Sequence, residues 1–251
     1  MTLEQILLIL AVGFVAGFLN TIAGGGSLLT LPVLIFLGVP ATVANATNRV
    51  ALFFQNIFGS LGFRSKGISN YPFSLYLGIS AFFGAIVGAL ISVRLDDQLF
   101  NRVIAIVIIM VVILTVLNPF KVKDGDKERM DKKHQVISTI VFFFLGIYGG
   151  FIQAGVGFLI IGTLTSVNRL NMAKTNSAKV FVVLIYTIAA LGVFIYEGAI
   201  NWGVGLTLAA GNSTGAWIAS RWSVKKSDKW IRWFVMVMAI ALAIKLWFET
   251  N

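Results

Sequence analysis

Two polar interruptions within hydrophobic segments carry the residues best suited to bind a ligand. The first is "NTIAGGGSLL", residues 20–29, and the second is "QAGVG", residues 153–157. Because each glycine costs a helix about 1 kcal/mol relative to alanine, clustered glycines predict a break in the helix. The backbone N–H groups that begin the next helix carry partial positive charge, and glycine lets a ligand approach them closely. The chemistry predicted at both breaks is the binding of an anion.

Polar side chains add hydrogen-bond donors to these breaks, and basic residues follow both of them. Amides, backbone N–H groups and cations together suit an oxyanion, which we expect to bind between the two breaks near the middle of the membrane. The predicted binding residues are Asn20, Thr21, Gly24, Gly25, Gly26, Ser27, Asn48, Arg49, Gln153, Gly155, Gly157, Asn176 and Lys179.

Each part of this site has a structural alternative. Arg49 and Lys179 could instead lie at helix ends and extend toward the membrane surface. Glycines can also serve as close-packing contacts between membrane helices. We favour packing for Gly84 with Gly88 and for Gly211 with Gly215, each pair spaced by four residues. At the breaks we favour ligand binding, because packing does not require the neighbouring Asn and Gln.

Catalytic and metal-binding patterns are missing from the sequence. It contains no Cys, and its one His, His134, lies in a charged segment. No Asp or Glu falls in the middle of a predicted membrane span. We therefore expect no catalytic residues, no metal site and no cofactor, so that the protein is not an enzyme.

The composition predicts a multi-pass membrane protein. The chain is 58% hydrophobic and 12% charged, whereas soluble domains contain about 25% charged residues. Its net charge of +10 is explained by Lys and Arg in cytoplasmic loops rather than by a nucleic-acid partner. Segments of about 20 apolar residues can cross the bilayer. The predicted spans are Leu75–Val93, Leu99–Leu117, Val136–Ile152, Val180–Tyr196, Val204–Ile218, Trp230–Phe248 and a shorter one, Val50–Phe63.

An internal repeat divides the chain into two halves. "GFVAGFLNTIAGGGSLL" from Gly13 is similar to "GIYGGFIQAGVGFLI" from Gly146, and "ANATN" (44–48) corresponds to "MAKTN" (172–176). We therefore predict an N-terminal membrane repeat (1–120), a cytoplasmic hydrophilic linker (121–135) and a C-terminal membrane repeat (136–251). Repeated halves with a substrate site at their interface are typical of transporters.

The distribution of basic residues predicts that the halves are inverted. If each broken segment crosses the membrane once, the 20 Lys and Arg divide almost equally between the two sides. If each segment turns back at its break, most Lys and Arg lie on one side of the membrane, which agrees with the positive-inside rule. The other side then holds only Arg49, Arg94, Arg102 and Lys245. The second arms, Ser27–Leu37 and Phe158–Ser166, are also too short to span the bilayer unaided.

The predicted fold is an all-α polytopic membrane protein of two inverted repeats. Each repeat has a glycine-broken first helix, either a hairpin or a discontinuous helix, followed by three transmembrane helices. This makes about eight transmembrane segments. We expect the protein in the cell (inner) membrane, with both termini outside.

The first break and the sequence after it resemble the TauE/SafE family of membrane permeases. The resemblance rests on "GFVAGFLNTIAGGGSLLTLPVLIFLGVP" followed by A-x-A-T-N, with the pattern repeated after a central hydrophilic loop. It covers essentially the whole chain, although the second copy has Val156 between its glycines and lacks two residues. The resemblance implies transport of sulfur-containing anions such as sulfite, sulfoacetate and other organosulfonates, mainly as export.

The leading hypothesis is a permease for a small anion that works by alternating access. Its expected partners are the anionic substrate and the lipid bilayer, with no nucleic acid, and the protein could form a homo-oligomer. The alternatives are a cation or metal exporter, which would need buried acidic or His ligands, and a membrane subunit that anchors a partner. A pure anchor would not need polar breaks in both halves.

Overall fold

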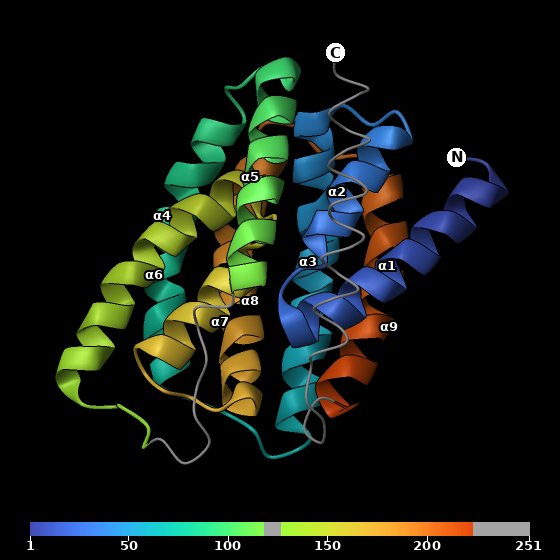
Figure 1. Ribbon diagram of the computed structural model, residues 1–251. Helices are drawn as coiled ribbons and strands as arrows, with labels where there is room; N and C mark the ends of the chain where they lie inside the picture. The colour runs from blue at the N-terminus through green and yellow to red at the C-terminus, as the bar shows by residue number, and fades with distance from the viewer. Residues whose placement is uncertain (118–126, 223–251) are drawn as a thin grey trace.

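A computed structural model describes residues 1–117 and 127–222, and in these ranges the regular secondary structure is entirely α-helical (Figure 1). The described helices are α1 (Leu3–Ala23), α2 (Ser27–Phe36), α3 (Ala41–Arg64), α4 (Phe73–Ser92), α5 (Asp97–Leu117), α6 (Lys132–Ile152), α7 (Val156–Ser166), α8 (Met172–Tyr196) and α9 (Trp202–Trp222).

Both predicted breaks interrupt helices where glycine adopts a left-handed backbone conformation. Gly24 ends α1 with φ at +86°, and Gly155 precedes α7 with φ at +72°. Residues with a Cβ rarely adopt this conformation, which explains why glycine stands at both positions. The break after α1 reverses the chain, since a Cβ on Gly26 would overlap the carbonyl oxygen of Ala16.

The two broken helices point toward the centre from opposite ends of the molecule. In Figure 1, α1 descends from the N-terminus and α2 rises from the break, whereas α6 rises and α7 descends. The helices α2 and α7 contain 10 and 11 residues. At about 1.5 Å per residue, each is too short to cross a bilayer alone.

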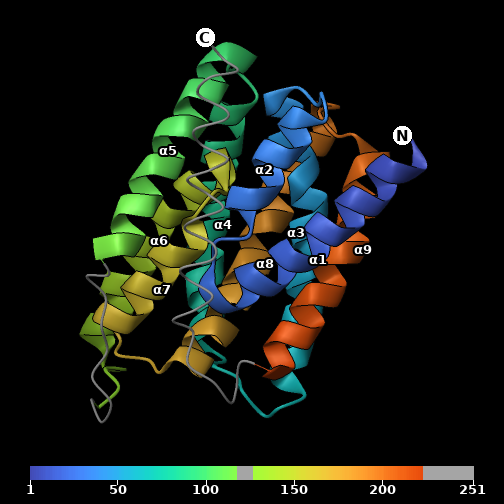
Figure 2. The same cartoon turned by 45° about the vertical axis from the view of Figure 1, so that its right-hand side comes forward.

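Packing between the halves is reciprocal. Helix α1 lies along α9, and α6 lies along α4 (Figures 1 and 2). Helix α3 also packs on α9, α8 packs on α4, and α3 and α8 contact each other. The first helix of each half is therefore packed against a helix of the other half.

Glycines permit the close approach of these helix pairs. A Cβ on Gly215 would overlap the carbonyl oxygen of Phe14 in α1, and one on Gly88 would overlap that of Ile147 in α6. Gly84 and Gly211 are equally tightly packed against the same two helices. These four glycines are packing residues, as their four-residue spacing predicts.

The predicted spans within the described residues are helical, but one prediction was wrong in length. Val50–Phe63 was expected as a shorter span, whereas α3 has 24 residues and starts at Ala41. Its first turns contain Asn45, Thr47 and Asn48, which lower the hydropathy but are buried inside the protein. The predicted span Trp230–Phe248 lies outside the described residues.

Four of the described helices, α1, α4, α6 and α8, are long and apolar enough to cross a membrane. Helices α2 and α7 are shorter apolar helices. The described part of the chain is therefore all-helical, with the composition of a multi-pass membrane protein.

Candidate functional site

The two glycine breaks meet inside the protein. A Cβ on Gly24 would overlap the backbone of Gly157, and a Cβ on Gly157 would overlap the backbone of Gly24. The starts of α2 and α7 are thereby brought close to one another, although they are more than a hundred residues apart in the sequence. The structure brings the predicted residues of the two breaks into one region.

Lys179 caps the C-terminal end of α1. Its Nζ donates hydrogen bonds of 2.8 Å to the carbonyl oxygens of Asn20 and Thr21, and one of 2.9 Å to Oδ1 of Asn176. The side chain comes from α8, so a residue of the second half caps the broken helix of the first half. A cation at this position is stabilised by the negative end of the helix dipole.

Arg49 has the same role for α6 in the opposite direction. Its guanidinium donates to the carbonyl oxygens of Gly149 and Gly150, the latter at 3.0 Å, and to Oε1 of Gln153 at 2.6 Å. The hydroxyl of Tyr186 donates to the same Oε1 at 3.0 Å. A residue of the first half thus caps the broken helix of the second half. It also orients Gln153, which is one of the predicted binding residues.

Both cations are interior residues. The exposed fraction is 0% for Arg49 and 2% for Lys179. The alternative that they extend from helix ends toward the membrane surface is therefore wrong. Since each neutralises the carbonyl end of one broken helix, the positively polarised N-terminal ends of α2 and α7 are the uncompensated dipole ends at the breaks.

Several donors at the first break lack a protein acceptor. Among the described residues, the backbone N–H groups of Gly25 and Gly26 donate to no acceptor. Ser27 Oγ and Asn48 Nδ2 are buried and likewise have no hydrogen-bond partner in the described part of the chain. Asn48 is held by Thr30, whose hydroxyl donates to its Oδ1 at 2.9 Å, so its amide group lies beside the first turns of α2. Unpartnered buried polar groups are costly, and a bound ligand is one way to satisfy them.

Gln55 and Asn212 are polar interior residues that the predicted site did not include. Asn212 Nδ2 donates to Gln55 Oε1 at 3.2 Å. Gln55 Nε2 and Asn212 Oδ1 are buried and have no hydrogen-bond partner among the described residues. The pair lies beside α1, because a Cβ on Gly17 would overlap the backbone of Asn212. Gln55 follows Asn48 by two helical turns, so helical spacing could have placed both on one face of α3.

The described residues of both halves thus form one polar region. Among them, the first half supplies more donors without a hydrogen-bond partner than the second half does. In the second half, Gln153 is engaged by Arg49 and Tyr186, and Asn176 by Lys179. Asn20 and Thr21 contribute carbonyl groups to Lys179. The hydroxyl of Thr21 donates to Gly17 within its own helix.

Comparison with known proteins shows which family the chain is similar to. The profile of the family described as "Sulfite exporter TauE/SafE" matches residues 9–246. A probable membrane transporter protein, ORF9, from Sinorhizobium sp. is 27% identical over 239 residues, covering 93% of this chain and 88% of its own. A probable membrane transporter protein from Haemophilus influenzae is 27% identical over 248 residues, covering 98% and 96%.

The probable membrane transporter protein YfcA of Escherichia coli K12 is 26% identical over 242 residues, covering 96% of this chain and 88% of its own. No solved structure matches the chain. The family match extends over both glycine breaks and both cations that cap them. The chain therefore belongs to the TauE/SafE family of membrane transporters.

Proposed function

We propose that the protein is an inner-membrane permease for a small anion, a sulfur-containing oxyanion or organosulfonate such as sulfite or sulfoacetate. One observation carries the proposal. Within the described part of the chain, the buried charged side chains are Arg49 and Lys179, both positive, and no carboxylate is buried with them. Ionisable side chains buried at membrane depth mark a functional site, and positive ones favour an anionic ligand.

The anion would bind where the two breaks meet. Backbone N–H groups at the starts of α2 and α7 supply donors. Ser27 and Asn48 add side-chain donors that have no acceptor among the described residues. Because the carbonyl ends of α1 and α6 already hold the two cations, these carbonyls do not repel the anion. Gln55 and Asn212 offer additional polar groups.

Alternating access would follow from two inverted halves that rock against each other. The reciprocal packing of α1 on α9 and of α6 on α4 supports an inverted repeat. With a glycine-broken first helix followed by three transmembrane helices in each half, the chain would have about eight membrane segments and both termini outside. Substrate sites at the interface of such repeats are typical of transporters.

Export would need little coupling machinery. With a cytoplasm negative by 100 mV, each negative charge that leaves gains about 2.3 kcal/mol. The orientation predicted from the basic loops places the hydrophilic linker in the cytoplasm. The proposed direction of transport is therefore outward.

Flux measurements on reconstituted protein test the proposal. Radiolabelled sulfite and a small sulfonate are offered to proteoliposomes under an imposed membrane potential, with the parent protein and the variants Asn48→Ala and Gln153→Ala. We expect voltage-dependent anion flux that both substitutions reduce at least tenfold. Asn56→Ala is the matched control, because this buried amide of α3 donates to Leu52 of its own helix. Absence of flux of every sulfur anion from folded protein, or equal loss in the control, would reject the proposed substrate or site.

A further inference from the structure

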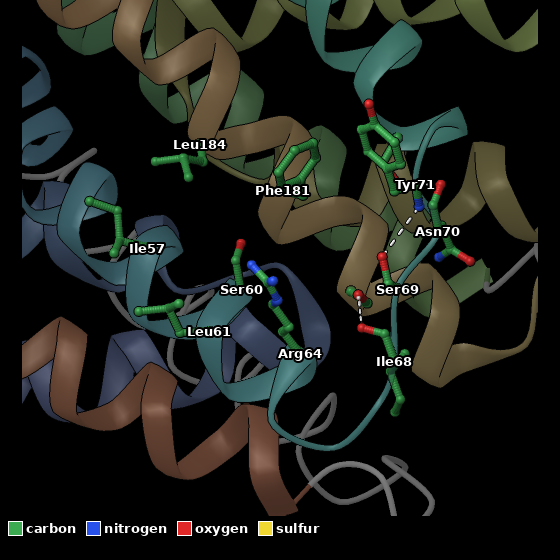
Figure 3. A pocket seen from close by; sticks show the side chains of 12 residues that line it. Ile57, Ser60, Leu61, Arg64, Ile68, Ser69, Asn70, Tyr71, Phe181 and Leu184 are labelled. Carbon is green, nitrogen blue, oxygen red and sulfur yellow. Dashed lines mark hydrogen bonds between the residues drawn. The ribbon is translucent and has the colours of Figure 1, made fainter.

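A cavity lies away from the glycine breaks, between the C-terminal part of α3, the start of α4 and the first half of α8. Its volume is about 520 Å³. Figure 3 shows Ile57, Ser60, Leu61 and Arg64 along one wall, opposite Phe181 and Leu184. Ser69, Asn70 and Tyr71 of the loop before α4 close one end of the cavity.

The lining of this cavity changes from polar to apolar along the direction of the helices. Arg64 is the last residue of α3, whereas Leu61 and Ile57 lie one and two turns deeper. On α8, Ser177 lies near the helix start, and Phe181 and Leu184 lie further inside. An apolar depth beneath a polar, basic rim matches the profile of a bilayer from its interior to its headgroup region.

Two features of the rim point to an anionic ligand. Ser60 Oγ is buried and has no hydrogen-bond partner among the residues that the structure describes. Figure 3 shows that Ser60 and Arg64 point into the same opening. Arg64 is exposed and forms no ion pair with a described residue. The lining contains no Asp or Glu. The exposed Lys66 on the adjoining loop adds a second positive charge.

We propose that this cavity binds one anionic phospholipid from the surrounding bilayer. The phosphate would lie against Arg64 and Ser60, and an acyl chain would run between Ile57 and Leu61 on one side and Phe181 and Leu184 on the other. Basic pockets between membrane helices are suited to anionic headgroups. A small inorganic anion would leave the apolar depth of the cavity unfilled. The proposal does not depend on the transported substrate.

Lipid binding to the purified full-length protein tests this site. Native mass spectrometry compares phosphatidylglycerol with phosphatidylcholine of identical acyl chains, for the parent protein and for Arg64→Gln, Arg64→Lys and Arg221→Gln. Arg221 is the matched control. It is an exposed arginine near the C-terminal end of α9, which packs beside the end of α3, and its guanidinium lies 5.0 Å from the ring centroid of Trp217.

The parent protein is expected to retain phosphatidylglycerol in preference to phosphatidylcholine. Arg64→Gln is expected to weaken that binding about fivefold, whereas Arg64→Lys and Arg221→Gln keep it. Size-exclusion chromatography establishes that each variant is folded. No headgroup preference in the parent, or equal weakening in Arg221→Gln, would overturn the proposal.

A competition arm separates a lipid phosphate from a free anion. Inorganic phosphate and sulfite at millimolar concentration are expected to leave bound phosphatidylglycerol in place. Displacement by sulfite that depends on Arg64 would instead identify the cavity as part of the substrate path and overturn the lipid assignment. Because no flux is measured, failure of the transport proposal does not affect this result.

Discussion

At the scale of single residues, the buried cations stabilise the broken helices of the opposite half. Lys179 of α8 donates to two carbonyl groups at the end of α1, and Arg49 of α3 donates to two at the end of α6. A buried charge costs several kcal/mol unless it is paired and hydrogen-bonded. The carbonyl ends of the two helices supply these hydrogen bonds to both cations.

Replacement of Lys179 by Met should destabilise the protein. The carbonyl groups of Asn20 and Thr21 would lose their donor, and hydrogen bonds to a charged group contribute about 1.5–3 kcal/mol each. We expect the variant in detergent to have a lower melting temperature than the parent protein. Thermal unfolding monitored by tryptophan fluorescence measures this difference. Lys133→Met is the control, because Lys133 is exposed in the first turn of α6. Equal melting temperatures for both variants would show that the cap does not stabilise α1.

Arg49 should not be replaceable by Lys. The guanidinium reaches Gly149, Gly150 and Gln153 at once through two nitrogen atoms. An ammonium group is a single point and lacks this planar geometry. We expect Arg49→Lys to lose at least tenfold in anion flux while remaining folded in size-exclusion chromatography. Flux equal to that of the parent protein would show that charge alone suffices at this position.

At the scale of elements, the contact between the two breaks depends on the absence of side chains. Gly24 and Gly157 approach so closely that a Cβ on either would overlap the backbone of the other. Gly157 is the more informative of the two, since its helical backbone imposes no conformational demand for glycine. It separates the effect of the contact from the effect of backbone strain.

Gly157→Ala should push the two breaks apart. Overpacking of this kind typically costs about 1–3 kcal/mol, and we expect reduced thermal stability together with loss of flux. Gly192→Ala in α8 is the control, because nothing lies within 4 Å of its added Cβ. Alanine is the better helix former, so this control should be neutral or slightly stabilising. If Gly157→Ala had the same thermal stability and flux as the Gly192→Ala control, the contact between the two breaks would be unimportant.

At the scale of the whole molecule, reciprocal packing makes the halves interdependent. Helix α1 packs on α9 and α6 packs on α4, so neither broken helix is held mainly by its own half. If the halves moved relative to one another, each break would move together with the helix of the other half on which it packs. This coupling is what alternating access through the site would require.

Single cysteines can test the proposed inverted topology, since the chain contains none of its own. Lys66 lies exposed in the α3–α4 connection, and Glu197 lies exposed in the α8–α9 connection. These connections occupy equivalent positions in the two halves. An impermeant thiol reagent applied to intact cells should label Glu197→Cys, whereas Lys66→Cys should react only after the membrane is opened. Labelling of both variants from the same side would establish parallel halves.

The helices and the breaks could be predicted because both depend on local properties. A run of apolar residues predicts a span wherever it occurs, and clustered glycines interrupt a helix irrespective of its neighbours. The length of α3 was the exception. Asn45, Thr47 and Asn48 read as polar in the sequence but are buried among other helices.

The sequence by itself determined the membrane class, the family and the positions of the two breaks, because composition and glycine content act along the chain. Only the tertiary structure decided how these parts combine. The contact of Gly24 with Gly157, the caps provided by Arg49 and Lys179, and the Gln55–Asn212 pair all join residues more than a hundred positions apart. Such contacts depend on how whole helices pack, and helix packing is set by the complementary shapes of surfaces that a single sequence does not place side by side.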